Sequence, residues 1–305
     1  MNKEQLISAL SRLIGEEHVL PDEPMSGHTS FRIGGPADFF LEPKQKAQLA
    51  GLLRLLEEER IPYFIMGNGS NLLVADEGYR GAVIRIGKNM GHAEVRGDQI
   101  IAECGALLSG ISALASANSL TGFEFAGGIP GTLGGACVMN AGAYGGEMKQ
   151  VLREVTVLDE KREIRVLKNE ELELAYRSSI FMRTPLIALE AKIQLAHGDR
   201  EAIEGLCADL RERRQSKQPL DLPSAGSTFK RPEGYFAGKL IMDAGLRGYR
   251  VGGAMVSEKH WGFIVNAGGA TARDVRELIS AVQARVFELY GVALETEIRM
   301  LGAEP

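Results

Sequence analysis

The sequence predicts an α+β fold, and two observations carry that prediction. Amphipathic helices and short strands mix along the chain, but they do not alternate regularly as they would in a doubly wound sheet. Two apolar, alternating segments, 154–159 and 163–167, lie close enough together to form an antiparallel hairpin. With 305 residues, of which 45% are hydrophobic, the chain can bury ample core in two or three domains.

The first third of the chain contains two predicted helices and two predicted strands. Helix 3–14 carries four apolar residues on one face: Leu6, Ile7, Leu10 and Leu13. Helix 44–60 ends at Ile61-Pro62, and its clearer inward stripe consists of Leu49, Leu52, Leu53 and Leu56. The apolar runs 63–66 and 81–86 predict strands.

The middle of the chain continues the mixed pattern. A strand at 99–104 precedes a helix at 106–118, and the alternating segment 186–195 follows the hairpin. A break at 196–199 predicts a domain boundary. Asp199 can cap a helix that extends to about Lys217, with an apolar stripe of Ile203, Leu206, Cys207 and Leu210.

The last part of the chain contains one strong helix between two strands. The strands are 262–266 and 297–301. The helix spans 271–290, where Thr271 can cap it and Asp274 favours its positive end. Its inward stripe consists of Val275, Leu278, Ile279, Val282, Val286 and Leu289.

Charge and composition exclude several classes of function. A net charge of −5 with no basic face argues against nucleic-acid binding, and the cluster 211–214 (RERR) is interpreted as a solvated helix face. Cys104, Cys137 and Cys207 are far apart, which predicts buried free thiols rather than disulfides. The histidines show no ligand spacing, so no metal site is predicted. We expect a cytoplasmic protein without membrane contact, since no secretory pattern or spanning apolar run occurs.

The run 127–135 (GGIPGTLGG) is the most informative motif. Five of its nine residues are glycine, so its backbone is nearly bare. Bare backbone can approach a ligand closely, and consecutive N–H groups in a tight turn form a concavity for anions. The ligand predicted is a phosphate or pyrophosphate; the alternative is a packed turn between two elements.

Two further loops have the same character. Segment 67–71 (GNGSN) follows the predicted strand 63–66, and segment 29–35 (TSFRIGG) precedes both. Three such loops predict one extended ligand with several polar groups. The familiar nucleotide motifs fail, since Leu72 replaces the third glycine of a dinucleotide fingerprint and 234–240 is one residue short of a P-loop.

Seven segments, taken in order, resemble the UDP-N-acetylenolpyruvoylglucosamine reductase family of flavoenzymes in peptidoglycan precursor synthesis. They run in family order across nearly the whole chain, which makes the resemblance very specific. The segments are 29–35 (TSFRIGG), 67–74 (GNGSNLLV), 128–145 (GIPGTLGGACVMNAGAYG), 176–179 (YRSS), 225–232 (AGSTFKRP), 237–240 (AGKL) and 295–299 (ETEIR).

The resemblance implies a two-lobed FAD-binding unit of the vanillyl-alcohol-oxidase (PCMH) type and a smaller C-terminal α+β substrate-binding domain. We place the FAD-binding domain at 1–198, with lobes of about 1–88 and 89–198, and the UDP-sugar domain at 199–305. The implied reaction uses NADPH to reduce FAD, which then reduces the enolpyruvyl ether of UDP-N-acetylglucosamine to UDP-N-acetylmuramate. We expect a monomer.

The resemblance also assigns roles to residues. It implies that Arg177 binds the substrate carboxylate, that Ser227 donates a proton and that Glu297 polarises the enolate or acts as an acid, with Glu295 as the obvious competitor. Substrate-binding residues would be Tyr176, Lys230, Arg231 and Lys239. FAD-binding residues would be Arg32, Ile33, Gly34, Gly67, Asn68, Gly69, Ser70, Asn71, Gly128, Ile129, Gly131, Thr132, Gly134, Gly135, Asn140 and Gly142.

Some positions depart from the family pattern. Arg231 stands where the longer class of the family has asparagine, and the inserted loop of that class, with its substrate-clamping tyrosine, is missing here. Tyr235 is more simply interpreted as a surface residue than as a replacement, and Trp261 stands where a small residue is usual. Two alternatives stay open: another flavin oxidoreductase of the same fold, and a non-catalytic UDP-sugar- or flavin-binding module.

Overall fold

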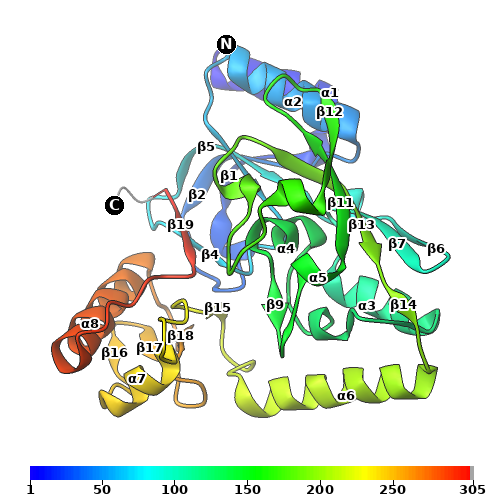
Figure 1. The fold of residues 1–305 in the computed structure, drawn as a ribbon. Helices are drawn as coiled ribbons and strands as arrows, with labels where there is room; N and C mark the ends of the chain where they lie inside the picture. The colour runs from blue at the N-terminus through cyan, green and yellow to red at the C-terminus, as the bar shows by residue number, and fades with distance from the viewer. Residues whose placement is uncertain (303–305) are drawn as a thin grey trace. The chain divides into compact units, whose positions relative to one another are not determined.

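Helices and strands mix along the chain as predicted, which confirms the α+β class (Figure 1). The computed structural model describes residues 1–302. Short 3-10 turns connect several elements, at Glu16–His18, Met25–Gly27, Lys88–Met90, Glu124–Ala126, Asn169–Leu172 and Ile180–Met182.

The described chain forms two units that interleave along the sequence. Unit 1 contains residues 1–21, 39–68 and 81–214, and unit 2 contains residues 22–38, 69–80 and those from 215 onward. The chain therefore leaves unit 1 at 214, and two N-terminal segments belong to unit 2. The predicted domains, 1–198 and 199–305, are consecutive in the sequence, whereas these two units interleave. The assignment of FAD binding to the first range and UDP-sugar binding to the second stays a prediction.

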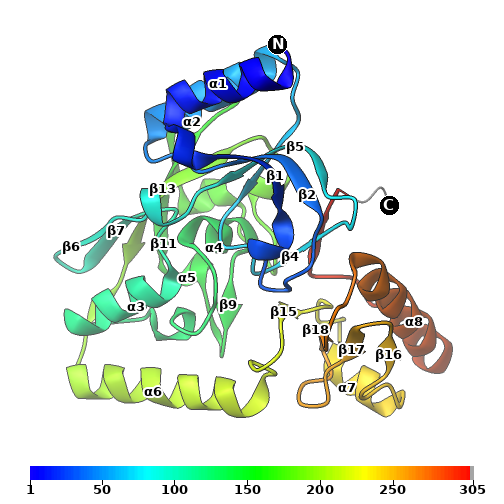
Figure 2. The ribbon, with the colours of Figure 1, turned by 180° about the vertical axis from the view of Figure 1, so that it is seen from behind.

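Unit 1 contains most of the helices. They are α1 (Lys3–Ile14), α2 (Lys46–Glu58), α3 (Leu108–Ala117), α4 (Leu133–Met139), α5 (Met148–Val151) and α6 (Arg200–Lys217). The first two pack against each other, α3 packs against β6 and β7, and α4 packs against β7 and β13. In both views α6 runs alongside α3 (Figures 1 and 2), where Ser112 Oγ lies 4.0 Å from Cys207 Sγ.

Two larger sheets involve the strands of unit 1. An antiparallel sheet has the order β12-β11-β13-β7-β6, and its β11–β12 pair is the predicted hairpin, with Val155 opposite Leu167. A second sheet has the order β1-β2-β5-β3, in which β3 and β5 are parallel. The strands of the first sheet are β6 (Ala93–Arg96), β7 (Gln99–Glu103), β11 (Leu152–Leu158), β12 (Ile164–Lys168) and β13 (Ile187–Gln194). Those of the second are β1 (Val19–Pro24), β2 (Pro36–Leu41), β3 (Tyr63–Met66) and β5 (Tyr79–Arg85).

Two short antiparallel strand pairs complete unit 1. They are β8 (Leu120–Thr121) with β14 (Ala196–His197), and β9 (Gly142–Ala143) with β10 (Gly146–Glu147). The strand at 196–197 occupies the predicted domain boundary. This segment therefore pairs within unit 1 rather than linking two domains.

Unit 2 is built from a small antiparallel sheet and helices that pack against it. The sheet has the order β15-β18-β17-β16, α8 packs on β16 and β17, and α7 packs on α8. A parallel pair, β4 with β19, joins Leu72 to Arg299. The bounds are β4 (Leu72–Val74), β15 (Ser224–Ser227), α7 (Ala237–Asp243), β16 (Arg250–Val251), β17 (Ala254–Val256), β18 (Phe263–Asn266), α8 (Ala272–Tyr290) and β19 (Arg299–Leu301).

The predicted apolar stripes are buried with a few exceptions. All four leucines predicted for α2 are buried, and Thr271 and Asp274 form a capping box at the start of α8. Leu13 and Leu289 lie at the edges of their stripes and remain 37% and 43% exposed. The stripe of α6 is largely wrong, since Leu206 is 44% exposed and only Ile203 is buried.

Candidate functional site

The predicted site residues divide between the two units, and each unit is described separately. Unit 1 holds Gly67, Asn68, Gly128, Ile129, Gly131, Thr132, Gly134, Gly135, Asn140, Gly142, Tyr176 and Arg177. Unit 2 holds Arg32, Ile33, Gly34, Gly69, Ser70, Asn71, Ser227, Lys230, Arg231, Lys239 and Glu297.

The glycine run of unit 1 is both a loop and a helix start. Thr132 is the N-cap of α4, and its side chain accepts a hydrogen bond from Gly135 N at 3.4 Å. The last two glycines of the run therefore lie in the first turn of α4 rather than in a loop. Gly134 N donates to Cys104 O at 2.8 Å, and a Cβ atom on Gly134 would lie 3.1 Å from Cys104 Cβ, so glycine lets the helix approach β7 closely.

The loop after β3 lies directly against this run. Asn68 Nδ2 donates to Pro130 O at 3.1 Å. A Cβ atom on Gly67 would lie only 2.1 Å from Thr132 Oγ1, so no side chain fits at that position without movement. The structure thus brings together two of the three loops that the sequence assigns to one ligand.

These two loops fit a phosphate-bearing cofactor such as FAD. Asn68, Gly128 and Gly135 are exposed, and the two glycines carry no side chain of their own, so a ligand can approach their backbone closely. The start of α4 adds the positive end of a short helix to the same place. The residues Gly67, Asn68, Gly128, Ile129, Gly131, Thr132, Gly134 and Gly135 would hold the cofactor in unit 1.

Arg177 is presented by a tight turn that Asn140 fixes. Arg177 is half-buried with φ 51°, and its Nη2 donates to Gly142 O at 3.3 Å. Asn140 is 1% exposed, and its Nδ2 donates to Ala175 O and to Glu147 Oε2, both at 3.0 Å. Because its amide is engaged by protein groups, Asn140 acts on the position of the Arg177 turn.

Tyr176 lies beside Arg177 on this turn. Its side chain is 53% exposed, and the Arg177 Cζ lies 5.4 Å from the centre of its ring. A guanidinium over an aromatic face is a favourable cation–π pair. The ring therefore helps to orient the guanidinium and leaves its own outer face accessible.

The remaining predicted FAD loops belong to unit 2. Ser30 N donates to Gly69 O at 3.2 Å, which joins the 29–35 loop to the 69–71 segment. Arg32 is exposed and adopts the left-handed conformation with φ 54°. Ile33 is 3% exposed and belongs to the core of unit 2, so only its backbone is available to a ligand. Gly34 has φ 139°, which favours glycine.

Unit 2 brings the segments of Ser227 and Glu297 together. Ser227 is the last residue of β15 and pairs with Phe263. The next residue, Thr228, accepts a hydrogen bond from Glu297 N at 2.8 Å, and Asn71 Nδ2 donates to Glu297 O at 3.2 Å. Both predicted catalytic side chains are half-buried. Glu297 lies just before β19 rather than within the predicted last strand.

The competitor Glu295 has a different environment. Its side chain is 74% exposed, and its Oε2 lies 3.1 Å from Lys230 Nζ. Glu297 is less exposed and its peptide is fixed on both sides by the bonds described above. A half-buried carboxyl on a fixed peptide is better suited to act on a substrate than a solvated one, so these surroundings favour Glu297 over Glu295.

The other predicted substrate-binding cations lie on the surface of unit 2. Lys239 Nζ forms an exposed ion pair with Asp243 at 2.7 Å, and the Arg231 guanidinium lies 4.6 Å from the centre of the Phe236 ring. Exposed ion pairs of this kind contribute about 0–1 kcal/mol. Lys239 can therefore exchange Asp243 for a ligand phosphate at little cost in free energy.

Two aromatic residues that depart from the family pattern have simple positions. Tyr235 is 49% exposed, as expected for a surface residue. Trp261 is half-buried and packs on the core of unit 2. Its neighbour His260 accepts a hydrogen bond from Gly262 N at 3.2 Å, and burial lowers the pKa of its imidazole.

Reasoning from the sequence missed Arg214. Instead of lying on a solvated face, it is half-buried against Gly128 of the glycine run. Its spacing was the available signal, since Arg214 follows Leu210 by four residues and Cys207 by seven, on the face that packs against the protein. The solvated interpretation of the 211–214 cluster is therefore wrong for this residue.

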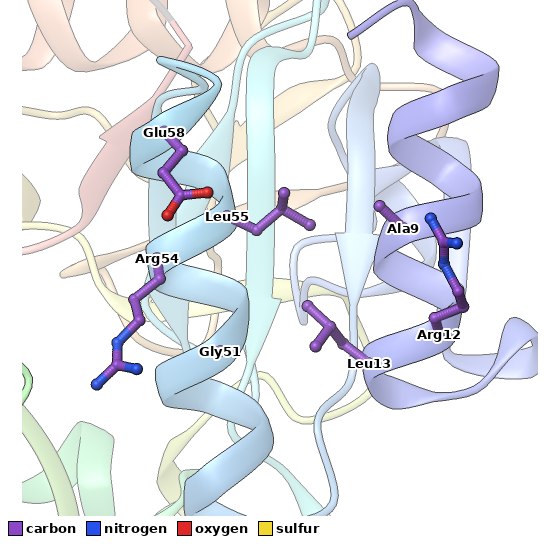
Figure 3. A pocket seen from close by; sticks show the side chains of 7 residues that line it. All are labelled: Ala9, Arg12, Leu13, Gly51, Arg54, Leu55 and Glu58. Atoms are coloured by element: carbon purple, nitrogen blue, oxygen red, sulfur yellow. The ribbon is translucent and has the colours of Figure 1, made fainter.

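A separate cleft lies between α1 and α2 (Figure 3). Its lining consists of Ala9, Arg12, Leu13, Gly51, Arg54, Leu55 and Glu58. Leu13 and Leu55 point toward one another from the two helices (Figure 3). None of the predicted site residues lines this cleft, so it has no part in the candidate site.

Within residues 1–302, no group of three or more His, Cys, Asp or Glu side chains is arranged to hold a metal ion. Within the same range, every helix is too short or too polar to cross a lipid bilayer.

Comparison with known proteins identifies the class first. Residues 37–168 match the family model described as FAD binding domain. Together with the α+β fold, this match defines an FAD-dependent oxidoreductase whose FAD-binding unit is of the vanillyl-alcohol-oxidase (PCMH) type.

The remaining comparisons identify the family. Residues 218–301 match the model described as UDP-N-acetylenolpyruvoylglucosamine reductase, C-terminal domain. The chain is 54% identical over 304 residues to the reductase of that name from Alkaliphilus oremlandii, with 100% of each chain covered. It is 52% identical over 299 residues to that from Caldanaerobacter subterraneus, covering 98% of this chain and 99% of the relative.

A solved structure agrees with these relatives. The crystal structure of UDP-N-acetylenolpyruvylglucosamine reductase from Thermus caldophilus is 34% identical, with a TM-score of 0.80, and the match covers 92% of this chain and 97% of that one. The chain belongs to the UDP-N-acetylenolpyruvoylglucosamine reductase family.

Proposed function

We propose that this chain catalyses the NADPH-dependent reduction, through FAD, of the enolpyruvyl ether of UDP-N-acetylglucosamine to UDP-N-acetylmuramate. The product is a precursor of peptidoglycan. Full-length identity of 54% to a reductase of this name supports the assignment. The observation that carries it is the direct hydrogen bond between the segments of Ser227 and Glu297, which unit 2 holds beside Asn71.

FAD would be held by backbone and amide groups of the glycine loops already described. When bound, it supplies the hydride that NADPH delivers to the protein. In unit 2 the contributing residues would be Arg32, Ile33, Gly34, Gly69, Ser70 and Asn71, and in unit 1 the glycine run, Gly67, Asn68 and the Asn140–Gly142 turn.

Arg177 would stabilise negative charge on the substrate. Addition of hydride to the terminal carbon of the enolpyruvyl double bond leaves charge that spreads into the adjacent carboxylate as an enolate. A guanidinium binds both oxygens of a carboxylate in parallel, so it favours the form with more charge on them. The hydrogen bond to Gly142 O and the Tyr176 ring hold the guanidinium before substrate arrives.

Ser227 would deliver the proton that completes the reduction. The hydroxyl proton moves to the carbon next to the carboxylate, and the resulting alkoxide needs a nearby cation or donor. Lys230 follows three residues later on the same segment and is the nearest cation in sequence. Glu297 would polarise the enolate or act as an acid, for which its carboxyl must be protonated.

The diphosphate of the substrate would be bound by cations of unit 2. These cations are Lys230, Arg231 and Lys239, and their positive charges would form charge-assisted hydrogen bonds with the phosphate oxygens. Tyr176 would contact the substrate beside Arg177. We propose that the protein is a monomer, and sedimentation analysis tests this. NADPH and a nucleotide-activated sugar as substrates support a cytoplasmic location, as do the three free thiols.

The absorbance spectrum of the flavin tests this proposal. Purified protein should be yellow, NADPH should bleach it, and the enolpyruvyl UDP-sugar should restore the colour. Reoxidation by oxygen alone would favour another flavin oxidoreductase of this fold. A colourless protein that binds the UDP-sugar would favour a binding module.

Variants test the residue roles. Ser227→Ala should leave bleaching by NADPH nearly intact and slow substrate-dependent reoxidation by at least about a hundredfold. Glu297→Gln should slow the same step, whereas the matched change Glu295→Gln should leave it near the wild-type rate. Equal effects of the two glutamate changes would remove Glu297 from its role.

A further inference from the structure

An apolar seam runs between helices α1 and α2 of unit 1. The two helices are antiparallel, since the amine of Met1 forms an ion pair with Glu59 at one end and Leu13 lies beside Gly51 at the other. Their buried leucines pack inward against the core of the unit. The cleft between them has a volume of about 320 Å³, and its apolar lining consists of Ala9, Leu13, Gly51 and Leu55.

Gly51 leaves room in this cleft at a cost to helix α2. Glycine in the interior of a helix is less favourable than alanine. A Cβ atom at this position would meet only Leu13 Cδ2, at 3.5 Å, which is ordinary van der Waals contact. Packing within the chain therefore does not require glycine here. The room left by the missing methyl group lies beside Leu13, which is 37% exposed, and it is available to an occupant of the cleft.

The charged residues that line the cleft are exposed and are not paired with one another. Arg54 and Glu58 are one helical turn apart, yet within residues 1–302 neither forms an ion pair. The same holds for Arg12 over that range. Arg12 lies in the last turn of α1, where a positive charge is favourable, but Arg54 lies in the body of α2 and has no such benefit.

Arg54 lies near a second cation. The side chain of Arg162 is 6% exposed and forms an ion pair with Glu57. Burial lowers the pKa of Arg162, and the nearby charge of Arg54 lowers it further. The two guanidiniums therefore repel each other. An anionic group brought beside Arg54 by an occupant of the cleft would offset this repulsion.

The arrangement of these charges selects the kind of occupant. Each arginine directly precedes a leucine of the cleft, and the pair of Leu13 and Leu55 lies between Arg12 and Arg54 (Figure 3). An occupant therefore needs an apolar body with an acidic group on each side. An amphipathic helix with acidic flanks has this form, and helices commonly dock in apolar grooves between other helices. An anionic lipid surface fits less well, because the carboxylate of Glu58 also lines the cleft.

We propose that the α1–α2 cleft binds an amphipathic helix of a partner protein that carries acidic residues on both flanks. Its apolar stripe would lie on the seam, and its acidic residues would pair with Arg12 and Arg54. A basic residue would pair with Glu58 and so fix the direction of the bound helix. The cleft contains none of the predicted site residues, so this inference is independent of the proposed function.

The probe is a fluorescein-labelled synthetic helix of about 20 residues, long enough to run along both helices. It has leucine at helical spacing, glutamate on both flanks and one lysine at the end that meets Glu58. Fluorescence anisotropy follows its titration with the FAD-loaded protein. We expect the double variant Arg12→Gln, Arg54→Gln to raise the dissociation constant about tenfold, as for loss of two exposed ion pairs. The control Arg60→Gln, an exposed arginine outside the cleft lining, should match wild type.

Substitutions of Gly51 test the shape of the cleft. Gly51→Leu fills the seam and should weaken binding at least about tenfold, as overpacked contacts do. Gly51→Ala adds an atom that the structure accommodates, so it should weaken binding less while the melting temperature stays at or above that of wild type. Unchanged affinity in all of these variants would overturn the proposal.

Two further results decide the place and nature of the occupant. A photoreactive residue at the centre of the apolar stripe of the probe should crosslink to 3–14 and 46–58, and crosslinks confined to other segments would overturn the proposal. Absence of wild-type binding up to about 1 mM probe would also overturn it. So would co-sedimentation with phosphatidylglycerol vesicles that is lost in the double arginine variant, or self-association that is lost in Gly51→Leu, because each identifies a different occupant.

Discussion

Replacing Gly67 by alanine tests the packing that joins two of the predicted FAD loops. The added Cβ atom would lie 2.1 Å from Thr132 Oγ1, 3.3 Å from Thr132 Cβ and 3.4 Å from Thr132 Cγ2. The closest of these is more than an ångström inside ordinary contact, so either the loop moves or the threonine rotates. Movement of packed groups costs about 1–3 kcal/mol, and rotation would remove the N-cap of α4, at a cost of about 1 kcal/mol.

We therefore expect Gly67→Ala to lower the free energy of unfolding by about 1–3 kcal/mol and to weaken FAD binding. Urea unfolding of the FAD-free protein, followed by circular dichroism, measures the first effect. The control is Gly110→Ala, in which the new Cβ atom in α3 has nothing within 4 Å. That change should be neutral or stabilising by up to about 1 kcal/mol, as alanine is the better helix former.

A double-mutant cycle with Thr132→Ala isolates the clash. Thr132→Ala alone should cost about 1 kcal/mol through loss of the N-cap. In that background Gly67→Ala should cost less than in wild type, because the atom at 2.1 Å is gone and the contact at 3.3 Å can relax. If Gly67→Ala costs the same in both backgrounds, the assigned contact is not the cause of its effect.

Two further substitutions and one labelling experiment have defined outcomes. Asn140→Asp should destabilise the protein by about 3 kcal/mol or more in urea unfolding, because it replaces a buried donor facing a carboxylate with an acceptor. Backbone N–H groups hold the pKa of Asp274 below its ordinary 3.8, so its carboxylate form stabilises the folded protein. Asp274→Asn should therefore lower the free energy of unfolding by its full amount above about pH 4, and the difference from wild type should shrink as the pH falls through the lowered pKa. Buried Cys104 and Cys137 should react with a thiol reagent only after unfolding, whereas half-buried Cys207 should react in the native protein, and fast labelling of all three would contradict the burial.

Local periodicity predicted much of the fold. The leucine stripe of α2, the β11–β12 hairpin and the capping box of α8 depend on residues within a few positions of one another, so the sequence displays them directly. The three loops were likewise visible, because bare backbone requires glycine. The sequence does not show which of these loops lie next to one another, since that depends on long-range contacts such as the hydrogen bond from Asn68 to Pro130.

The errors arose where distant packing overrides the local pattern. Two glycines at the start of α4 argue against a helix, yet Gly134 is needed there because the helix start touches Cys104. The stripe of α6 is amphipathic in sequence, but the packing in unit 1 buries only Ile203 and leaves Leu206 exposed. Arg214 is the converse case, in which a charged residue occupies the packed face of the same helix.

Within residues 1–302, four of the nine non-glycine residues with left-handed backbone lie in the predicted site segments. Arg32, Asn140, Tyr144 and Arg177 have φ values of 54°, 42°, 53° and 51°. Each such residue costs about 1 kcal/mol or more, and surrounding contacts must hold it there. For Arg177 these contacts are visible, because the buried Asn140 amide bonds the preceding turn and Gly142 O accepts from the guanidinium. Since the protein itself fixes this conformation, the guanidinium that we propose to bind the substrate carboxylate is in place before any ligand arrives, and ligand binding need not supply the energy to order it.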